Sequence, residues 1–297
     1  MVKTKSVLIT VVTHNRIADL KVCIESIRHQ SYKSFDILII NNGSDDGTKE
    51  WLATQPDIIA INQENVGGAG GFFTGMKYMY DNGYQWLLMM DDDGISDKDE
   101  LKNLMAGYQL IKKEVADEII LNSLVVDKDN HRQTAFFWAR GSGRSRNIED
   151  LKQTLYFKDI HPFNGTLIKR SVIDKIRFIK KEMFIWGDEK EYMARALHYG
   201  IRSYTYTSAI HYHPKEKGIR GNVIPFISRF QILLKPHNMS HIFYRNEGYI
   251  YNVYPERRDK MFIFCAAYII RFITHLEIVE LIKFIKFFRR GMNNIFY

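Results

Sequence analysis

Three adjacent aspartates at residues 91–93 are the side chains of this sequence best suited to chemistry. They follow the apolar run 86–90 and precede Gly94, so the pattern predicts a buried parallel strand that carries its acidic tip to the end of a sheet. Carboxylates this close repel one another and lose solvation beside a core, which favours a bound cation. The hard oxygen ligands of Asp91 and Asp93 suit Mg²⁺ or Mn²⁺ that also holds a diphosphate. The alternative is a solvated acidic turn.

Two further strands are predicted before this acidic motif. Residues 7–13 and 35–40 are rich in β-branched and apolar side chains, as expected of strands that are covered on both faces. A predicted helix through Leu20, Cys23, Ile24 and Ile27 separates them, and polar turn formers follow at residues 41–48. Strand, helix, strand and polar loop indicate a right-handed α/β sheet. Ligands of such sheets lie beyond the carboxyl ends of the strands, so we expect these loops to meet the acidic motif.

A glycine-rich stretch at residues 65–72 follows a short predicted strand, 58–62, and precedes a predicted helix, 73–80. Glycines let the backbone approach a ligand closely, and a helix start offers free N–H groups. The stretch lacks the Lys-Ser/Thr ending of a P-loop. A flexible connector is the alternative interpretation.

Two more clusters of candidate catalytic groups lie further along the chain. Asp188 stands at the entry to a predicted helix, where a carboxylate is stabilised as the anion; the alternative is an N-cap with acidic first-turn residues. Glu189 and Glu191 are reserve acids there, and Glu191 is predicted to be a surface or acceptor-contact residue. His211 and His213 lie on one side of a predicted strand at its end. A His-x-His pair suggests a metal site, although a structural or surface role is the alternative.

Composition bounds the class of protein. The 297 residues carry a formal net charge of +8 and two cysteines, Cys23 and Cys265. Two distant cysteines support neither a disulfide framework nor a zinc site, which favours a reducing compartment. The start of the chain does not resemble a signal peptide, and the best apolar run, 261–273, is too short to span a membrane and contains Arg271. The positive charge favours anionic partners such as nucleotides or anionic lipid. No nucleic-acid-binding motif is present and the cations are scattered, so we expect no nucleic acid partner.

An ordered series of motifs resembles the nucleotide-sugar half of family 2 glycosyltransferases, which have a GT-A fold. The series consists of residues 11–16, 41–48 and 65–68 followed by the triple aspartate, and the resemblance covers about the first 215 residues. The glycines of residues 67–71 followed by Phe72, with a triple Asp, are similar to bacterial galactofuranosyltransferases and the related rhamnosyltransferases.

The resemblance implies roles for the matching residues. Asp91 and Asp93 correspond to the metal-binding motif, and a histidine after the last strand joins them, for which His211 suits the resemblance slightly better than His213. An acidic pair at the position of Asp188 includes the general base. Many relatives have Asp where this chain has Asn41, so the resemblance leaves uracil and thymine recognition open. The residues expected to bind the nucleotide sugar are Thr13, Asn15, Arg16, Asn41, Asp45, Asn65, Gly67, Gly68 and Asp92.

Other segments carry weaker signals. Residues 98–113 are predicted to form a helix and 119–126 a strand, whereas 127–157, with Arg140, Arg144 and Arg146, are expected to form a mobile loop near the acceptor. Residues 163–168 resemble the acceptor-side strand of the family.

Beyond Pro214, residues 221–234 and 239–254 are expected to be helical or irregular. The tetrad 243–246, Phe-Tyr-Arg-Asn, is similar to a Tyr-Tyr-Arg-Asn segment of relatives, with packing of the tail as the alternative. Residues 261–288 alternate large apolar groups with cations, as in an amphipathic helix at an anionic lipid surface. An ordinary helix hairpin is the alternative.

These observations together predict an α/β protein with a GT-A (Rossmann-like) sheet, mixed and mostly parallel, flanked by helices and followed by a C-terminal helical extension. We expect a catalytic domain at residues 1–215 and a helical, membrane-associating region at 216–297. The predicted activity is a Mn²⁺- or Mg²⁺-dependent inverting transfer of galactofuranose from UDP-galactofuranose to a glycan or lipid-linked glycan, in synthesis of an O-antigen or capsule. The expected location is the cytoplasm, at the inner face of the plasma membrane. The alternatives are a rhamnosyltransferase using dTDP-rhamnose and a non-catalytic nucleotide-sugar-binding scaffold.

Overall fold

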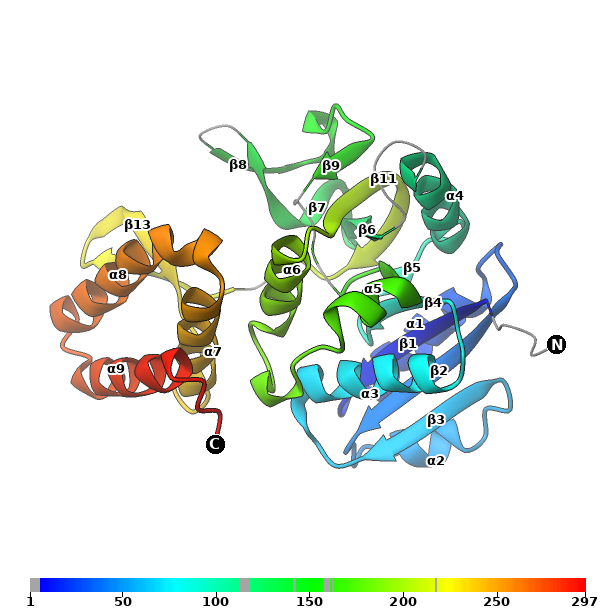
Figure 1. Ribbon diagram of the computed structural model, residues 1–297, viewed down its shortest axis with the longest axis horizontal. Helices are drawn as coiled ribbons and strands as arrows, with labels where there is room; N and C mark the ends of the chain where they lie inside the picture. Colours follow the sequence, from blue (N-terminus) through cyan, green and yellow to red (C-terminus); the bar gives the residue numbers. More distant parts are fainter. Residues whose placement is uncertain (1–5, 113–117, 141–142, 158–160, 162, 217) are drawn as a thin grey trace. The chain divides into compact units, whose positions relative to one another are not determined.

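The chain forms two compact units (Figure 1). One comprises Met1–Lys181 and Tyr199–Glu216, and the other Glu182–His198 and Lys217–Tyr297. The computed structural model describes residues 6–112, 118–140, 143–157, 161, 163–216 and 218–297. These units differ from the expected division at residue 215 mainly in Glu182–His198, which groups with the C-terminal residues.

The first unit is built on one large mixed sheet with strand order β3-β2-β1-β4-β10-β6-β11-β5. Strands β3, β2, β1 and β4 run parallel, as do β6 and β11, whereas β10 is antiparallel to both of its neighbours. The mostly parallel sheet predicted from the sequence is therefore confirmed. The strands are β1 (Val7–Thr13), β2 (Phe35–Asn42), β3 (Ile58–Gln63), β4 (Trp86–Asp91), β5 (Ile95–Ser96), β6 (Ile119–Asp127), β7 (Asn130–Arg140), β8 (Gly143–Asn147), β9 (Leu155–Phe157), β10 (Thr166–Lys169) and β11 (Arg202–His213).

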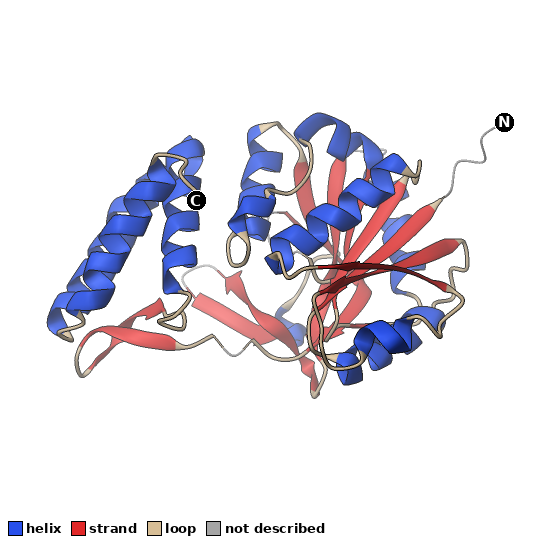
Figure 2. Cartoon of the chain, turned by 90° about the horizontal axis from the view of Figure 1, so that it is seen from below, coloured by secondary structure: helices blue, strands red, loops and turns tan. Residues whose placement is uncertain are grey.

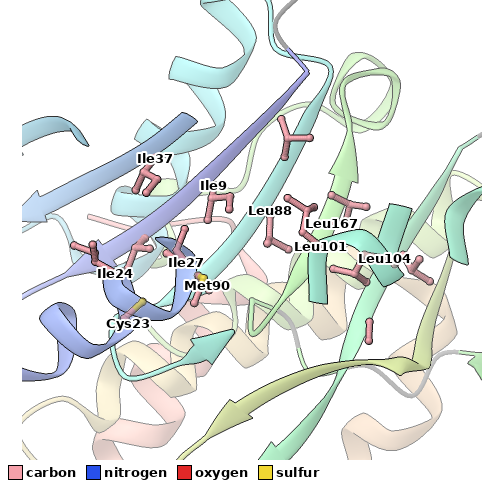
Figure 3. Packing of buried hydrophobic residues seen from close by; sticks show 14 of the residues in the cluster. Ile9, Cys23, Ile24, Ile27, Ile37, Leu88, Met90, Leu101, Leu104 and Leu167 are labelled. Carbon is pink, nitrogen blue, oxygen red and sulfur yellow. The ribbon is translucent and has the colours of Figure 1, made fainter. Parts of the chain in front are cut away.

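Helices cover both faces of this sheet (Figures 1 and 2). On one face, Ile24 and Ile27 of α1 and Leu104 of α4 pack with Ile9 and Leu88 of the strands (Figure 3). Side chains alternate along a strand, so Thr10 of β1 points to the other face, where α3 lies. The helices are α1 (Ile17–Arg28), α2 (Thr48–Leu52), α3 (Gly67–Asp81), α4 (Glu100–Lys112) and α5 (Arg170–Ile176).

The glycine-rich stretch has a different structure from the one expected. Helix α3 begins at Gly67, not near residue 73, so the glycines form its first turns. A Cβ on Gly71 would lie 2.4 Å from Val12, and one on Gly75 would lie 2.7 Å from the Thr10 hydroxyl. These glycines let the helix approach β1 closely.

Residues 127–157 contain regular structure where a mobile loop was expected. They form β7, β8, the short 3-10 helix Ile148–Asp150 and β9. Trp138 of β7 packs with Leu124 and Val126 of β6, and this apolar contact gives the segment a small core of its own. The structure describes the Arg146 side chain of the expected basic cluster, whereas the side chains of Arg140 and Arg144 lie outside the described residues.

The second unit combines helices with a β-hairpin. Its elements are α6 (Asp188–His198), β12 (Arg220–Ile224), β13 (Ile227–Leu233), α7 (Ser240–Val253), the 3-10 helix Pro255–Lys260, α8 (Met261–Thr274) and α9 (Ile278–Met292). The expectation of helical or irregular structure at residues 221–234 was wrong: they form an antiparallel pair. The turn between the strands contains Phe226 with a φ of 66°. The spacing of aromatic residues, on which the prediction was based, does not indicate such a turn.

Aromatic side chains make the core of this unit. Tyr244 of α7, Tyr268 and Phe272 of α8, and Phe284 and Phe288 of α9 belong to one buried cluster. Helices α7 and α9 approach closely at two glycines, since a Cβ on Gly248 or Gly291 would meet backbone of the other helix. The segment predicted as an amphipathic helix or a hairpin thus forms two helices. Within the described residues, we find no helix with the length and apolar character needed to cross a membrane.

Candidate active site

Three parallel strands end at one edge of the sheet and bring their polar termini together. Thr13 at the end of β1 lies beside Asn41 of β2, and Val12 lies beside Asp91 of β4. This is the carboxyl edge at which ligands of α/β sheets bind. The predicted meeting of the first two loops with the acidic motif is therefore confirmed by the strand register.

Asp91, Asp93 and His213 form a cluster at this edge. One potential ligand atom from each lies within 4.8 Å of the others, and His213 Nε2 is 3.2 Å from Asp93 Oδ1. His213 Nδ1 lies 2.7 Å from the carbonyl oxygen of Pro214; because a carbonyl only accepts, Nδ1 carries a proton and Nε2 faces the carboxylates. Two carboxylates and an imidazole are ligands that Mn²⁺ or Mg²⁺ accepts, and three protein ligands leave positions for a diphosphate. The residues therefore fit such an ion.

Electrostatics in this cluster favour the ionised carboxylate of Asp93. Burial alone would raise the pKa of Asp93, but hydrogen bonding and charge attraction from His213 and Arg16 hold it at about 2. Burial works against protonation of His213, yet its contact with Asp93 raises the pKa of the imidazole. Asp93 is therefore a carboxylate anion at neutral pH, which is the form that binds a cation.

Asp92 is not part of this cluster, and it contacts the end of the first strand. Its carboxylate accepts hydrogen bonds from the Thr13 hydroxyl at 2.8 Å and from Arg16 Nη1 at 3.3 Å. Burial raises the pKa of Asp92 to about 6 despite these contacts. Arg16 also donates to Asp93 at 2.7 Å, so this guanidinium links the two carboxylates.

His211 lies deeper than His213. It is fully buried, and its Nδ1 is 3.2 Å from Glu100 Oε1, which also accepts from the Ser123 hydroxyl at 2.7 Å. A Cβ on Gly94 would lie 2.4 Å from His211 Nε2, so the imidazole supports the acidic loop from beneath. The slight preference for His211 as the ligand is not matched by this geometry, which brings His213 to the two aspartates.

Amide side chains join the loops that were expected to border the nucleotide. Asn15 Oδ1 accepts from the backbone N–H of Asp45 at 2.8 Å, and Asn41 Oδ1 accepts from that of Ser44 at 3.1 Å. Asn65 Oδ1 accepts from the backbone N–H of Gly67 at 3.0 Å. These predicted residues therefore lie together at the edge. Gly68 has open space where a Cβ would stand.

Asn42 is a residue of this edge that the sequence analysis did not single out. Its Nδ2 donates to the carbonyl oxygen of Gly67 at 3.0 Å, and its Oδ1 accepts from the backbone N–H of Val66 at 3.2 Å. It thus ties β2 to the start of α3. Its place within the polar loop at residues 41–48 was the available signal.

The remaining predicted residue, Asp188, belongs to the second unit. It is the first residue of α6 and is buried. Glu191, expected at the surface, is also buried: its carboxylate accepts from Arg195 Nε at 3.0 Å and from the Tyr254 hydroxyl at 2.5 Å. Its contacts give Glu191 a structural role, which contradicts the first alternative of the prediction, a surface or acceptor-contact residue.

A parallel sheet with an Asp-X-Asp motif and a histidine at its carboxyl edge is the arrangement of GT-A glycosyltransferases. The chain belongs to glycosyltransferase family 2, because the family model described as "Glycosyl transferase family 2" matches residues 8–177. It is therefore an enzyme of the inverting glycosyltransferase class.

Several known proteins are similar to this chain. Galactofuranosyltransferase GlfT1 of Mycobacterium tuberculosis is 29% identical over 221 residues, which are 71% of each protein. The protein of the same name from Mycolicibacterium smegmatis is 27% identical over 72% of each chain. The undecaprenyl-phosphate mannosyltransferase of Micrococcus luteus is 29% identical over 35% of this chain and 44% of that protein.

Two solved structures share the fold. Mannosyltransferase PcManGT from Pyrobaculum calidifontis, in complex with GDP-Man and Mn²⁺, has a TM-score of 0.51 at 14% identity and covers 86% of this chain, which spans 64% of that structure. TarS 1–349 of S. aureus has a TM-score of 0.55 at 12% identity, with coverage of 97% and 90%.

Proposed function

We propose that this enzyme transfers galactofuranose from UDP-galactofuranose to a glycan or lipid-linked glycan during synthesis of a cell-surface polysaccharide such as an O-antigen or capsule. The cluster of Asp91, Asp93 and His213 carries the proposal, because it suits a cation that holds a nucleotide diphosphate. Relatives named as galactofuranosyltransferases, at 27–29% identity, support the choice of sugar.

Asp91, Asp93 and His213 would hold Mn²⁺ or Mg²⁺. When bound, the ion would supply positive charge that stabilises the leaving diphosphate. Arg16 stays charged, since the surrounding aspartates raise the pKa of its guanidinium although burial opposes this. It donates a hydrogen bond to Asp92, whose carboxylate would contact the sugar or ribose of the donor.

The loops joined by amide side chains would bind the nucleotide. We assign nucleotide contacts to Thr13, Asn15, Asn41 and Asp45, and assign the start of α3 at Asn65, Gly67 and Gly68 to the phosphate side. Fifteen-residue α3 begins at this edge, and the N-terminus of a helix attracts anions.

Asp188 is our candidate for the general base, within a catalytic domain that we place at residues 1–215. Its carboxylate would take the proton of the acceptor hydroxyl as that oxygen forms a bond to the anomeric carbon. The bond from the anomeric carbon to the diphosphate breaks, and its electron pair leaves with UDP.

We also propose that residues 216–297 bind an anionic membrane, which would bring the enzyme to a lipid-linked acceptor at the cytoplasmic face. Residues 217–297 contain thirteen Lys and Arg against five Asp and Glu, a net charge of +8 that equals the charge of the whole chain. A groove of about 510 Å³ on α9 combines Ile282 and Ile285 with Lys286, Arg289 and Arg290. Other exposed apolar side chains of this unit include Phe226, Ile227, Phe230, Phe262, Ile263, Ile270, Ile273, Leu276, Ile278 and Val279. Apolar groups beside cations match the boundary between headgroups and acyl chains.

Calorimetric titration with UDP, dTDP, GDP and CMP, each with and without Mn²⁺ or Mg²⁺, tests the central proposal. We expect metal-dependent binding of UDP, weakened at least about tenfold in Asp93→Asn, which loses one anionic ligand. Asp99→Asn, at an exposed carboxylate six residues further along the chain, serves as the control. Stronger binding of dTDP would favour the rhamnosyltransferase. A UDP affinity that changes neither on addition of metal nor in Asp93→Asn would contradict the metal site. Nucleotide binding without transfer to any acceptor would favour the non-catalytic scaffold.

A further inference from the structure

The segment that leads into α6 has an unusual backbone. Phe184 and Trp186 have φ angles of 65° and 58°, and Gly187 has a φ of 124°. Side chains other than glycine disfavour this region by roughly 1–2 kcal/mol for each residue, so neighbouring structure must hold the segment in place. Asp188 follows directly and begins the helix.

The fully buried side chain of Asn246, on α7, supplies hydrogen bonds to this segment. Its Nδ2 lies 2.9 Å from the carbonyl oxygen of Met183 and 3.0 Å from those of Ile185 and Trp186. A Cβ on Gly187 would be 3.1 Å from Asn246 Cβ, so the segment lies directly against this residue. The side chain therefore satisfies backbone carbonyls that the unusual φ angles remove from regular structure.

Arg245 completes the contact. Its Nε and Nη2 donate to Asn246 Oδ1 at 3.1 and 3.0 Å, which turns the amide nitrogen of Asn246 towards the segment. Nη2 also donates to the carbonyl oxygens of Glu182 and Met183 at 3.0 and 3.1 Å. Nη1 donates to the carbonyl oxygen of Phe296 at 2.9 Å.

Burial of this guanidinium carries an electrostatic cost. Desolvation, with repulsion from Arg290, lowers the pKa of Arg245 to about 10. Among the described residues, the hydrogen bonds of Arg245 go to carbonyl and amide oxygens, not to a carboxylate. A buried cation without such a partner is expensive, and two of its hydrogen bonds go directly to the backbone that leads into α6.

We propose that Arg245 and Asn246 are positioning residues that fix Trp186 and Asp188 for the acceptor step. This inference rests on the proposed role of Asp188, and it gives the 243–246 tetrad a purpose beyond packing of the tail. Displacement of a reacting group by about 1 Å can cost on the order of 100-fold in rate. A side chain that sets the helix entry therefore acts on catalysis through Asp188.

Hydrogen exchange in the full-length protein tests the structural half of the proposal. In Asn246→Ala, we expect at least tenfold faster exchange at the amides of Ile185 and Glu191, which donate to Met183 and Gly187. Asn246→Asp keeps the shape of the side chain but removes its donors, and should act in the same direction. Asn252→Ala, six residues further along α7, is the matched control and should leave exchange unchanged. Unchanged exchange in both Asn246 variants would overturn the proposal.

The catalytic half is tested by UDP release from UDP-galactofuranose with octyl β-D-galactofuranoside as acceptor. We expect kcat of Asn246→Ala to fall on the order of 10- to 100-fold, while the Kd for UDP with Mn²⁺ stays within about twofold. A parallel loss of UDP affinity would indicate general destabilisation and contradict a positioning role, as would an unchanged kcat.

Asp188→Asn separates this proposal from the proposed function. We expect that variant to bind UDP normally and to lose a factor of about 100 to 10,000 in kcat. Normal turnover by Asp188→Asn would reject Asp188 as the base. If Asp188→Asn is inactive and Asn246→Ala is fully active, only the positioning role of Asn246 is rejected.

Discussion

His211 and His213 share one face of β11 but have opposite surroundings. His213 lies at the strand end with Nε2 near Asp93, whereas His211 is enclosed and contacts Glu100. The first can exchange its partner for an ion, because the cluster is partly exposed. The second contributes to the fold beneath the acidic loop.

Substitution of the two histidines should therefore have different effects. We expect His213→Gln to weaken Mn²⁺-dependent UDP binding at least about tenfold while changing the unfolding free energy little. His211→Gln should instead lower the unfolding free energy by about 1–3 kcal/mol, since it disturbs a buried polar contact. Calorimetry and urea unfolding of both variants measure the two quantities. The reverse assignment of effects would show that His211 is the ligand.

Sequence reasoning could find the residue types of this site but not the depth of each side chain. Alternation along a strand puts both histidines on one face, and the triple Asp is visible as a motif. Which histidine reaches the acidic loop depends on how β11 pairs with β6, including an irregularity in register between Tyr206 and Ile210. Such a shift has no signature in the local sequence.

Helix α3 shows how one element can serve both packing and binding. Gly71 and Gly75 face β1, whereas Gly68 has open space at the helix start. Glycines spaced four residues apart lie on one side of a helix, so the contact of Gly71 and Gly75 with a neighbouring element could have been predicted from their spacing. The sequence analysis assigned the glycines to a ligand loop because it placed the helix start near residue 73.

Alanine substitutions separate these glycines. Gly71→Ala should lower the unfolding free energy by about 1–3 kcal/mol, because the new methyl group collides with Val12. Gly68→Ala is the matched control, and we expect it to leave stability unchanged or to raise it by up to about 1 kcal/mol. Urea denaturation measures both. Equal changes of the unfolding free energy in the two variants would mean that the close contact with β1 is not the reason why residue 71 is a glycine.

Strands β1 and β2 were predictable from composition, whereas the hairpin β12–β13 was not. Residues 7–13 and 35–40 consist of consecutive β-branched and apolar residues, a pattern that local propensity and burial both favour. The hairpin is short, and several of its apolar side chains are exposed. Its strand structure follows from pairing across a turn at Phe226, which is a contact between segments rather than a local preference.

At the scale of the whole molecule, the order of segments along the chain differs from their grouping in space. The chain leaves the first unit at Glu182, forms α6 in the second, returns for β11 and leaves again after Glu216. A boundary drawn from sequence alone falls at the last motif and keeps α6 with the first unit, whereas the contacts group α6 with the C-terminal residues. Contacts such as those of Asn246, which join residues about sixty positions apart, decide this grouping.

Net charge is also unevenly distributed along the chain, and this leads to a prediction about lipid. The full-length protein should bind vesicles of phosphatidylglycerol and phosphatidylcholine more tightly than phosphatidylcholine alone, and binding should weaken as salt increases. The double variant Ile282→Ser with Ile285→Ser should bind at least about tenfold more weakly, since both exposed side chains would enter the headgroup boundary. Cosedimentation measures the bound fraction.

Val22→Ser with Leu110→Ser is the control for this experiment, because both residues are exposed apolar side chains of the first unit. We expect the control to bind anionic vesicles like the wild type. Equal binding by all three proteins would contradict a role for α9 at the membrane.

The amide network at the sheet edge has a consequence for measurements of nucleotide affinity as a function of pH. Asn15, Asn41, Asn42 and Asn65 join the loops through groups that neither gain nor lose a proton at ordinary pH. The shape of these loops should therefore persist across the buffer range used in enzymology. Any change of nucleotide affinity with pH then reports on the carboxylates and histidine nearby. The loops keep their structure while those groups gain or lose protons.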